Sequence, residues 1–453
     1  MSIIGPWEVD RLLLASAQEA NVLPITSRCD SRCVFCSHRN NPPGIATVFA
    51  GARSLEEIKR IVAFLDPDRP IIIGESATLL IEGEPFSHPA FREILSLVRR
   101  VHPSTPLEIT SNGRFLTAET VGFLETLGHV FLNVSVNSAS ARGRRLLMGD
   151  TEAQSERVIT GVRLLSRSSV SFAGSLVAMP NLTGWDDIRD TIQFLADNGA
   201  LAASVVMPAF SALADRDIFP DGEQVYGELR EFVGSLSAEL PCPVLVEPSC
   251  VSDLTPAVSG VLKGSPAWDA GIRRNDVLIA VNGRKPTCRV EAWNMLRAEG
   301  EIKAEVERDG RVFTVRWANG IRGDPGVTME YDFDPARAQD LRRSVMDYPG
   351  KSVLLASELG HVVVGRVLES MSIGPDRAEV VMVRNHTFGG TIRAAGLLTV
   401  DDYLECLASQ PASRPEPAQI ILPRETFDSH GRDLKRRHFS ELQEQTGVPV
   451  LLR

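Results

Sequence analysis

Hydrophobic positions in the first 210 residues alternate between two patterns. Stretches at 55–65, 91–101 and 119–127 carry apolar residues every three or four positions, as amphipathic helices do. Between them lie short apolar runs of strand type, at 22–26, 70–73, 107–110, 130–136, 170–179 and 202–207. Strand–helix alternation of this kind predicts a parallel sheet, either open or curled into a barrel.

The run that begins at Val130 separates apolar from polar side chains. Because successive strand residues point to opposite faces, one face is apolar and the other polar. The two sets are Leu132, Val134 and Val136, and Asn133, Ser135 and Asn137. A polar inner face predicts a barrel whose lumen holds a polar ligand, and the alternative is an edge strand with one wet face.

The pattern changes near residues 241–260, which are rich in proline and serine. Beyond them, a helix at about 288–299 and two strands joined by an Asp-Gly turn predict a small β-rich module that ends near Trp317. From Lys351 the α/β alternation returns. We therefore expect an α/β protein of three domains, at 1–240, 241–320 and 321–453.

Composition and charge limit the binding partners and the cellular compartment that we expect for the protein. The chain has 453 residues and a formal net charge of −10, which disfavours a nucleic-acid partner. No apolar stretch is long enough for a membrane span, and the N-terminus lacks a secretion signal. Seven scattered cysteines do not suggest a disulfide framework, so we expect a reducing, cytoplasmic setting.

Three of the cysteines stand close together in RCDSRCVFCSHRN, residues 28–40, as Cys29, Cys33 and Cys36. Three thiolates on one loop can hold three corners of a [4Fe–4S] cluster and leave the fourth iron open. The alternatives are zinc completed by His38, or no metal. The loop follows the first expected strand, and the carboxyl ends of such strands form the active sites of barrels.

The spacing CxxxCxxC, with Phe35 before the last cysteine, resembles the signature of the radical S-adenosylmethionine (SAM) enzymes. The resemblance implies a partial (β/α)6 TIM-like barrel over roughly residues 20–210. It also implies a [4Fe–4S] cluster whose open iron binds SAM, with Phe35 near the adenine. Such enzymes cleave SAM to a 5′-deoxyadenosyl radical and take electrons from a reductant such as flavodoxin or ferredoxin.

Further stretches agree with the same family. EGEPFSHP (82–89) resembles its GGEP motif, which implies that Gly83, Glu84 and Pro85 meet the SAM amino group, although Glu82 replaces the first glycine. TSNG (110–113) resembles the turn whose Ser111 and Asn112 face the SAM pocket. The remaining implied SAM contacts are Ser135, Asn137 and one of Arg142, Arg144 and Arg145, with Arg145 as our candidate. No residue can be named as the partner of the substrate in hydrogen transfer.

The middle module, KGSPAWDAGIRRNDVLIAVNG, resembles a PDZ domain in which Asn275 replaces a glycine. Such domains bind an extended peptide by strand addition beside a helix, and the alternative is a rigid spacer. The C-terminal part, above all Asn385–Asp401, resembles a domain from a family that also combines PDZ with a radical-SAM-like barrel. His386 and Arg384 lie on its main loop as candidates for reaching a substrate.

We therefore expect a radical SAM enzyme that acts on a peptide or protein, because a peptide-binding module is attached. One alternative is a small metabolite or cofactor precursor as substrate. Another is a non-catalytic, metal-binding PDZ adaptor. Cys242 and Cys250 are the residues from which a second cluster would have to be built, and buried structural thiols are the simpler interpretation.

Overall fold

The computed structural model describes residues 6–215, 218, 222–236, 240–319, 324–411 and 416–453. The chain divides into two compact units. Unit 1 comprises Met1–Asn40, Ala46–Pro208 and Asp215–Glu247, and unit 2 comprises Asn41–Ile45, Ala209–Ala214 and Pro248–Arg453.

Unit 1 is built on a six-stranded parallel sheet whose strands follow one another in chain order, β1-β2-β3-β4-β5-β6. This confirms the expected partial barrel of TIM type. The strands are β1 (Ile71–Ile73), β2 (Leu107–Ser111), β3 (Val130–Ser135), β4 (Ser171–Val177), β5 (Ala203–Val206) and β6 (Val244–Glu247). The main helices are α1 (Pro6–Ala20), α2 (Leu55–Val62), α3 (Phe91–Val101), α4 (Ala118–Leu127), α5 (Ala141–Met148), α6 (Glu152–Leu165), α7 (Pro180–Thr183), α8 (Trp185–Asp197) and α9 (Gly222–Leu236), and two short 3-10 helices are η1 (Ser37–Arg39) and η2 (Pro85–Ser87).

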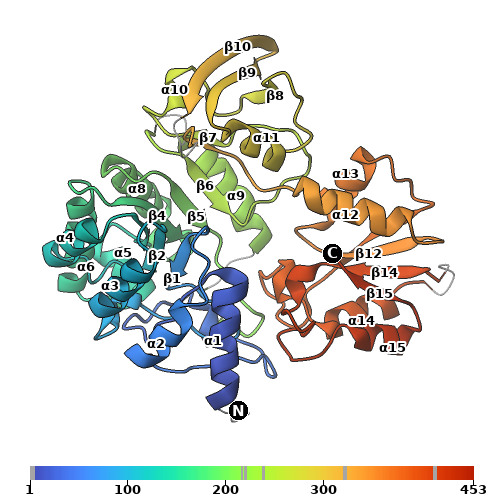
Figure 1. The fold of residues 1–453 in the computed structure, drawn as a ribbon, viewed down its shortest axis with the longest axis horizontal. Helices are drawn as coiled ribbons and strands as arrows, with labels where there is room; N and C mark the ends of the chain where they lie inside the picture. Colours follow the sequence, from blue (N-terminus) through green and yellow to red (C-terminus); the bar gives the residue numbers. More distant parts are fainter. Residues whose placement is uncertain (1–5, 216–217, 219–221, 237–239, 320–323, 412–415) are drawn as a thin grey trace. The chain divides into compact units, whose positions relative to one another are not determined.

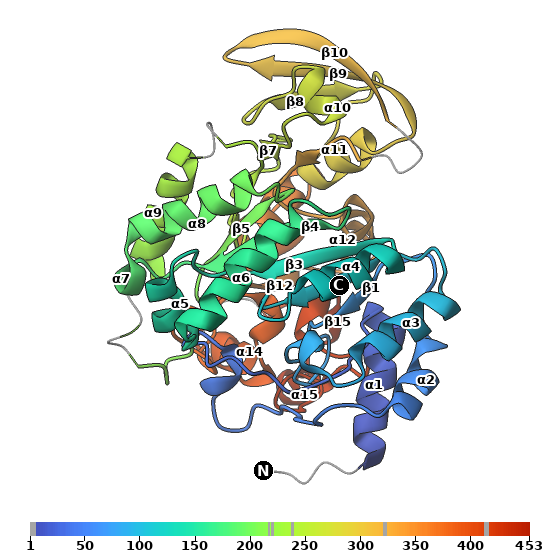
Figure 2. The ribbon, with the colours of Figure 1, turned by 90° about the vertical axis from the view of Figure 1, so that its left-hand side faces the viewer.

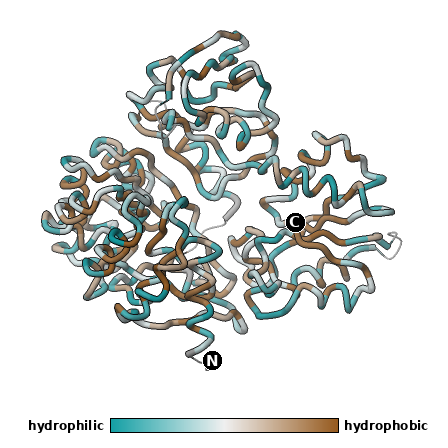
Figure 3. Tube along the Cα trace, viewed as in Figure 1, coloured by the Kyte–Doolittle hydropathy of each residue, from teal (hydrophilic) through white to brown (hydrophobic). Residues whose placement is uncertain are grey.

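The helices of unit 1 pack on one face of this sheet, and Figure 2 shows α4, α6 and α8 lying over its central strands. Strand side chains on that face, such as Leu132 and Val134, are fully buried in the core. Helices begin where the sequence supplies a cap, as at Ser54 and Thr151, each of which forms a capping box. Apolar residues concentrate on the strands of the sheets (Figure 3).

One expectation for the edges of this sheet is wrong, and one edge strand was not expected. Residues 22–26 are not a strand, and they form only isolated bridges such as Val22 with Ile72. Part of the reason is that the Ile25 and Thr26 amides donate to the carboxylate of Glu82, at 3.1 and 3.4 Å, instead of to a neighbouring strand. Strand β6 lies in the proline-rich stretch where the pattern indicated no strand.

Unit 2 contains the β-rich module. Its antiparallel sheet has the order β10-β9-β8, and a separate antiparallel pair joins β7 to β11. Asn275 has a φ of 67°, the left-handed conformation that asparagine accepts in place of glycine. The elements are β7 (Gly260–Val261), α10 (Pro266–Asp269), β8 (Val277–Val281), α11 (Arg289–Leu296), β9 (Gly300–Arg308), β10 (Arg311–Asn319) and β11 (Val327–Thr328).

The rest of unit 2 is a parallel sheet of order β13-β12-β14-β15 between two helical layers (Figure 1). Helices α12 and α13 share one hydrophobic core with the sheet, and α14 and α15 share the other. The elements are α12 (Pro335–Met346), β12 (Ser352–Ser357), α13 (His361–Ser370), β13 (Ala378–Val383), η3 (Ala395–Leu397), α14 (Val400–Ala408), β14 (Gln419–Leu422), η4 (Arg424–Thr426), α15 (Ser440–Thr446) and β15 (Val450–Leu452). No helix in the described ranges is long and apolar enough to cross a membrane.

Candidate active site

The cysteine loop is fixed to the end of helix α5 through its backbone. The Arg32 amide donates to the carbonyl of Met148 at 3.1 Å, and the Val34 amide donates to that of Leu147 at 2.9 Å. Within the loop, the Cys36 amide donates to the Cys33 carbonyl at 3.3 Å. The thiol-bearing residues are therefore held by main-chain contacts on both sides of Cys33.

The loop thiols influence one another electrostatically. Burial, and then the neighbouring thiols of Cys29 and Cys36, raise the pKa of Cys33 to about 12, while Arg114 opposes the rise. Burial also raises the pKa of Cys29, which is the exposed member of the three. Three soft thiolate donors that repel one another without a cation are the ligand set of an iron–sulfur or zinc site. Among the described residues, no group of three or more His, Cys, Asp or Glu side chains is placed around a point that could hold a single metal ion.

The GEP backbone lies directly against the start of the cysteine loop. The Gly83 amide donates to the Thr26 carbonyl at 2.7 Å, and the Glu84 amide donates to the Arg28 carbonyl at 2.9 Å. A Cβ at position 83 would lie 2.0 Å from the Arg28 carbonyl oxygen, closer than any real contact. Only glycine allows this approach, so the structure explains why that residue type stands beside Cys29.

The Glu84 side chain is turned into the protein. Its carboxylate accepts hydrogen bonds from the Asn112 amide at 2.7 Å, the Ser111 hydroxyl at 2.9 Å and the Phe86 amide at 3.2 Å. Burial raises the pKa of this carboxyl to about 7 against the lowering effect of those hydrogen bonds. Glu84 thus joins the GEP turn to the end of β2, and its two oxygens already serve the chain's own donors. Pro85 is the first residue of η2 and is also buried.

The turn after β2 reaches the cysteine loop. The Asn112 side-chain amide donates to the Asp30 carboxylate at 3.2 Å and to the Ser31 hydroxyl at 3.0 Å. Asn112 Oδ1 in turn accepts from the Arg114 amide at 2.9 Å. The cysteine loop, the GEP turn and the TSNG turn are therefore one hydrogen-bonded assembly.

Ser135 and Asn137, the two polar residues expected as SAM contacts at the end of β3, have different surroundings. Ser135 is half-buried and accepts a hydrogen bond from the Ser175 hydroxyl at 3.2 Å. Asn137 is buried with a φ of 59°, and its side-chain oxygen accepts from the Val177 amide at 3.0 Å. Asn137 therefore connects the ends of β3 and β4, and its amide group is largely engaged within the protein.

Along β3, polar residues on the face opposite the helices alternate with buried apolar ones as predicted, although Phe131 also lies on that face. Asn133 and Ser135 are half-exposed there, whereas Leu132, Val134 and Val136 are fully buried. Neighbouring strands add Thr110, whose hydroxyl donates to Glu75 at 2.7 Å, and Ser204, whose hydroxyl donates to Glu247 at 2.8 Å. Strands β2, β3 and β5 therefore all place polar side chains on this face.

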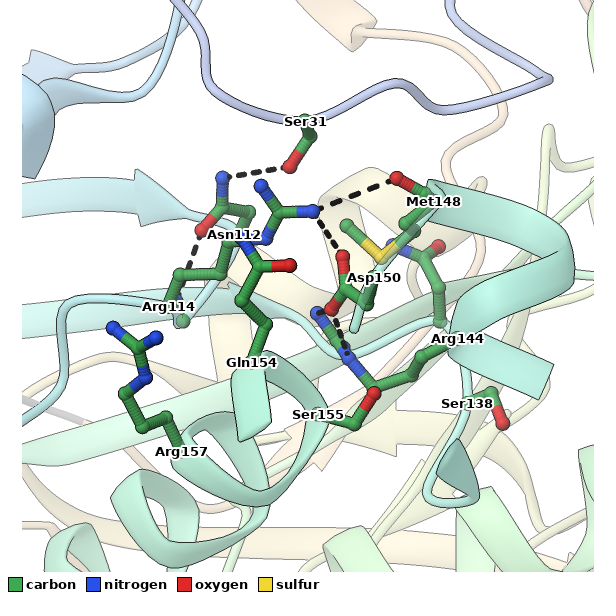
Figure 4. A network of polar contacts seen from close by, with 12 residues as sticks. Ser31, Asn112, Arg114, Ser138, Arg144, Met148, Asp150, Gln154, Ser155 and Arg157 are labelled. Atoms are coloured by element: carbon green, nitrogen blue, oxygen red, sulfur yellow. Dashed lines mark hydrogen bonds and ion pairs between the residues drawn. The ribbon is translucent and has the colours of Figure 1, made fainter. Parts of the chain in front are cut away.

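Sequence reasoning missed an ion network behind the cysteine loop (Figure 4). Arg114 and Arg144 both pair with Asp150, whose side chain is fully buried. Arg114 also pairs with Asp30 of the loop at 3.1 Å. The sequence signals were weak: Arg114 directly follows the TSNG motif, and Asp150 lies six residues after Arg144 but 36 residues after Arg114, outside every motif.

The three arginines considered as SAM contacts differ in how deeply they are buried. Arg144 is 0% exposed, and its guanidinium is committed to Asp150 and to the Val136 carbonyl. Arg142 and Arg145 are exposed on the same short helix. Phe35 is half-buried within the loop. Of the three arginines, only the exposed two have side chains available to a ligand.

The other four cysteines lie outside the loop in the sequence. Cys242 is buried in unit 1, and burial raises the pKa of its thiol to about 11. Cys250 and Cys288 lie in unit 2, where the Cys288 thiol donates to the Phe333 carbonyl at 3.3 Å. Cys406 donates to the Met382 carbonyl at 3.6 Å. Cys288 and Cys406 therefore have structural contacts of their own.

Two family models match the chain. Residues 23–195 match the radical SAM superfamily, and residues 257–301 match the PDZ domain. The cofactors of the radical SAM superfamily are a [4Fe–4S] cluster and SAM, and its members are enzymes. The three loop thiols and the closely approached Gly83 backbone fit such a cofactor pair.

Curated relatives match less than half of the chain. An AdoMet-dependent heme synthase of Methanosarcina barkeri is 27% identical over 182 residues, which is 40% of this chain and 48% of the relative. A GTP 3′,8-cyclase of Lactiplantibacillus plantarum is 24% identical over 213 residues, which is 47% of this chain and 58% of the relative. The chain thus spans about half the length of these relatives.

Solved structures with similarity include Streptococcus suis SuiB bound to the precursor peptide SuiA. It is 16% identical, has a TM-score of 0.40, and the match covers 55% of each chain. Another is anSMEcpe with bound AdoMet, 13% identical with a TM-score of 0.39 over 57% of this chain and 73% of that one.

Proposed function

The chain carries a radical SAM domain, and we propose that Cys29, Cys33 and Cys36 hold its [4Fe–4S] cluster. When bound, the cluster and SAM supply a 5′-deoxyadenosyl radical that abstracts a hydrogen atom from the substrate. The chain's own task is then to hold the loop rigid, orient SAM and present the substrate. The electron donor in this proposal is a small reductant such as flavodoxin or ferredoxin.

One observation carries the proposal: the backbone at Gly83 passes so close to Arg28 that no side chain fits there. This contact sets the GEP turn beside the first cysteine, where its main-chain groups and Pro85 can meet the SAM amino group. Arg114 and the end of α5 hold the other side of the loop. The site is therefore rigid on both flanks before any cofactor binds.

We assign the remaining SAM contacts from the positions of the residues around the cysteine loop. Ser111 and Asn112 line the turn that touches the loop, and Phe35 lies between two cluster thiols, where its ring can pack near the adenine. Ser135, on the open face of β3, is available to the ribose or carboxylate. In this proposal Asn137 orients the neighbouring backbone, and Arg145 pairs with the SAM carboxylate.

The test of this function is anaerobic. The full chain would be reconstituted with iron and sulfide and reduced with dithionite, and its EPR spectrum recorded with and without SAM while 5′-deoxyadenosine is assayed. We expect about four irons per chain, a reduced [4Fe–4S] signal that changes with SAM, and deoxyadenosine formation.

Two cysteine variants make the result specific. Cys33→Ala should lose the cluster signal and deoxyadenosine, whereas Cys250→Ala should keep both and the same iron content. About eight irons, falling to four in the second variant, would reveal a second cluster. A colourless protein with stoichiometric zinc and no deoxyadenosine would contradict the enzyme and favour a metal-binding adaptor.

The substrate that we propose is a peptide or protein. A PDZ domain at residues 257–301 supports this assignment, because such domains take extended peptides by strand addition beside a helix. In unit 2, the chain's own β11 pairs antiparallel with β7 of this domain. The Leu262 amide donates to Gly326 at 2.8 Å, and Trp293 of α11 donates to the Val327 carbonyl at 3.2 Å. An incoming peptide that uses this edge must displace β11.

The occupied edge supports a second candidate, a small metabolite or cofactor precursor. In that version β11 is a permanent part of the PDZ domain, and the substrate meets only the polar face of the barrel. The curated relatives named for heme and for GTP fit the same version. The two candidates therefore differ in whether β11 can leave β7.

Thr328→Pro separates the candidates. The change removes the hydroxyl that donates to the Gly260 carbonyl at 3.2 Å and puts proline in the pairing strand. Thr328→Val is the matched control, because it loses the hydroxyl but keeps a good strand residue. If the substrate is a peptide, displayed peptides should bind the proline variant more tightly than either the control or the unchanged chain. Binding peptides should also stimulate deoxyadenosine formation. A proline variant that folds but captures no peptide would favour the small-molecule substrate.

A further inference from the structure

Unit 2 contains a cavity of about 300 Å³ that neither the proposed cofactor site nor the proposed peptide-binding edge involves. It is lined by the ends of β12 and β14, by the start of α13 and by residues before α12. This volume is at the lower end of what protein sites for small molecules span. The cavity is therefore large enough for a compact organic ligand.

The cavity lies where the topology of the sheet reverses. From β12 the chain passes through α13 to β13 on one side, and it later passes through α14 to β14 on the other side of β12. The connections that leave the carboxyl ends of β12 and β14 diverge at this point. In open parallel sheets such a crevice is where ligands bind. Ser357 and Leu422, the last residues of these two strands, both line the cavity.

The walls of the cavity are mainly apolar. They include Val251, Leu341, Leu354, Val363, Val364 and Ile421. Tyr331 and Phe333 add aromatic surface, and the Tyr331 side chain is 61% exposed. A ligand body that contacts these walls must itself be aliphatic or aromatic.

The acidic groups of the lining already have partners within the chain. Glu425 pairs with Arg337, and Asp334 accepts from the Ala336 amide at 2.7 Å as the cap of α12. Asp332 accepts from the Arg289 amide at 2.7 Å. The other lining cation, Arg453, donates to the Ser344 hydroxyl at 2.6 Å. With its acids paired or capping, the cavity is suited to an uncharged ligand rather than to a phosphate.

The start of helix α13 closes one side of the cavity, with Gly360 as its N-cap. The Gly360 amide donates to the Ser357 carbonyl at 3.0 Å and to the Ser357 hydroxyl at 3.2 Å. The Val364 amide donates to the Gly360 carbonyl at 3.0 Å. These lining amides therefore have partners within the chain, and the side chains of Val363 and Val364 add to the apolar wall.

We propose that this cavity binds a small uncharged molecule with an aromatic or aliphatic body. The site belongs to the C-terminal α/β part of unit 2 and does not depend on the radical chemistry proposed above.

The test uses the full chain and the fluorescent probe 6-propionyl-2-(dimethylamino)naphthalene, which is uncharged. We expect saturable one-to-one binding with a blue-shifted emission. Val364→Trp, which fills the cavity, should weaken binding at least roughly tenfold. Val362→Trp is the matched control, since Val362 is exposed on the same helix and is not among the lining residues.

Two further measurements complete the test. Ala394→Trp fills the cavity from a loop, so a folding defect in one variant would not decide the result. The anionic probe 8-anilinonaphthalene-1-sulfonate has the same ring system, and we expect it to bind at least threefold more weakly. Non-saturable probe binding, or equal binding by both filled variants and the control, would overturn the site. Tighter binding of the anion that the filled variants abolish would overturn the uncharged class.

Discussion

Arg114 donates from Nη1 to the main-chain carbonyl of Asp30 at 2.7 Å. This hydrogen bond links the turn after β2 to the residue that follows the first cysteine. The same guanidinium pairs with Asp150, whose side chain is 0% exposed. Arg114 therefore connects the cysteine loop to a buried charge that the sequence motifs do not include.

Replacing Arg114 with methionine should lower both the free energy of unfolding and the iron content of the reconstituted protein. Among the described residues, Asp150 would keep only Arg144 as a cationic partner. Removing one partner of a buried ion pair costs about 3 kcal/mol. The loop would also lose its contact at Asp30. We expect the free energy of unfolding in urea to fall by about that amount, and the iron content after reconstitution to fall below half.

Arg92→Met is the control for this prediction. Arg92 pairs with Glu119 at 2.8 Å near the surface, where the two side chains are 36% and 77% exposed, so the pair contributes less than about 1 kcal/mol. Equal destabilisation by the two variants, or normal iron content in the Arg114 variant, would show that the network does not support the loop.

Gly83→Ala should damage SAM binding more than stability. The new Cβ would overlap the Arg28 carbonyl, so the GEP turn and the start of the cysteine loop must move apart. We expect the dissociation constant of SAM, measured anaerobically by calorimetry, to rise at least roughly tenfold, since misplacing one good hydrogen bond is enough for that change.

Gly122→Ala serves as the matched substitution. Gly122 lies within α4, and a Cβ there would meet no atom of the described residues within 4 Å. Alanine in a helix is more stable than glycine by roughly 0.5–1 kcal/mol, so this variant should be slightly stabilised and bind SAM normally. Unchanged SAM affinity in the Gly83 variant would remove the central argument for the proposed cofactor site.

The sequence predicted the architecture because its information is local. Alternation of period two in β3 and capping residues such as Ser54 are properties of neighbouring positions. The strand expected at 22–26 was wrong because a distant side chain, that of Glu82, takes its backbone amides. The pattern carries no record of such long-range hydrogen bonds.

The candidate site was predictable only where a motif marked it. Short motifs identified the cysteines, the GEP turn and Asn112, and the structure shows contacts among these stretches. The motifs did not indicate that Glu84 points inward or that Arg144 is buried against Asp150. Those roles depend on which side chain the fold desolvates, and desolvation is set by packing between segments far apart in the sequence.

Glu82 should make the stability of unit 1 depend on pH. Burial raises the pKa of its carboxyl to about 8, from an ordinary value near 4.5, although Arg53 and two amides oppose the rise. A group with a raised folded-state pKa binds its proton more tightly in the folded state. Its stabilising contribution is therefore full below pH 4.5 and is lost as the pH rises toward 8, with a slope of up to about 1.4 kcal/mol per pH unit.

Glu82→Gln is the variant that tests this dependence. Glutamine keeps the shape and the acceptor oxygen but does not titrate. We expect the urea-unfolding free energy of the unchanged chain to fall from pH 5 to pH 8 more steeply than that of the variant. Glu56→Gln, at an exposed side chain, should leave the slope as it is. Parallel pH profiles for all three proteins would show that Glu82 titrates normally.

Arg145 is the arginine that we expect to bind the SAM carboxylate. Its surroundings allow an effect on SAM binding to be distinguished from an effect on stability. Arg144 cannot take that role because its guanidinium is bonded to Asp150 and Val136. Arg145 is exposed on α5, the helix whose last residues, Leu147 and Met148, fix the cysteine loop. Arg145→Ala should therefore weaken SAM binding about tenfold, as loss of a charged hydrogen bond does, and change the unfolding free energy by less than about 0.5 kcal/mol. Arg142→Ala, at the other exposed arginine of α5, should change neither quantity, and a loss of SAM affinity there alone would move the carboxylate contact to Arg142.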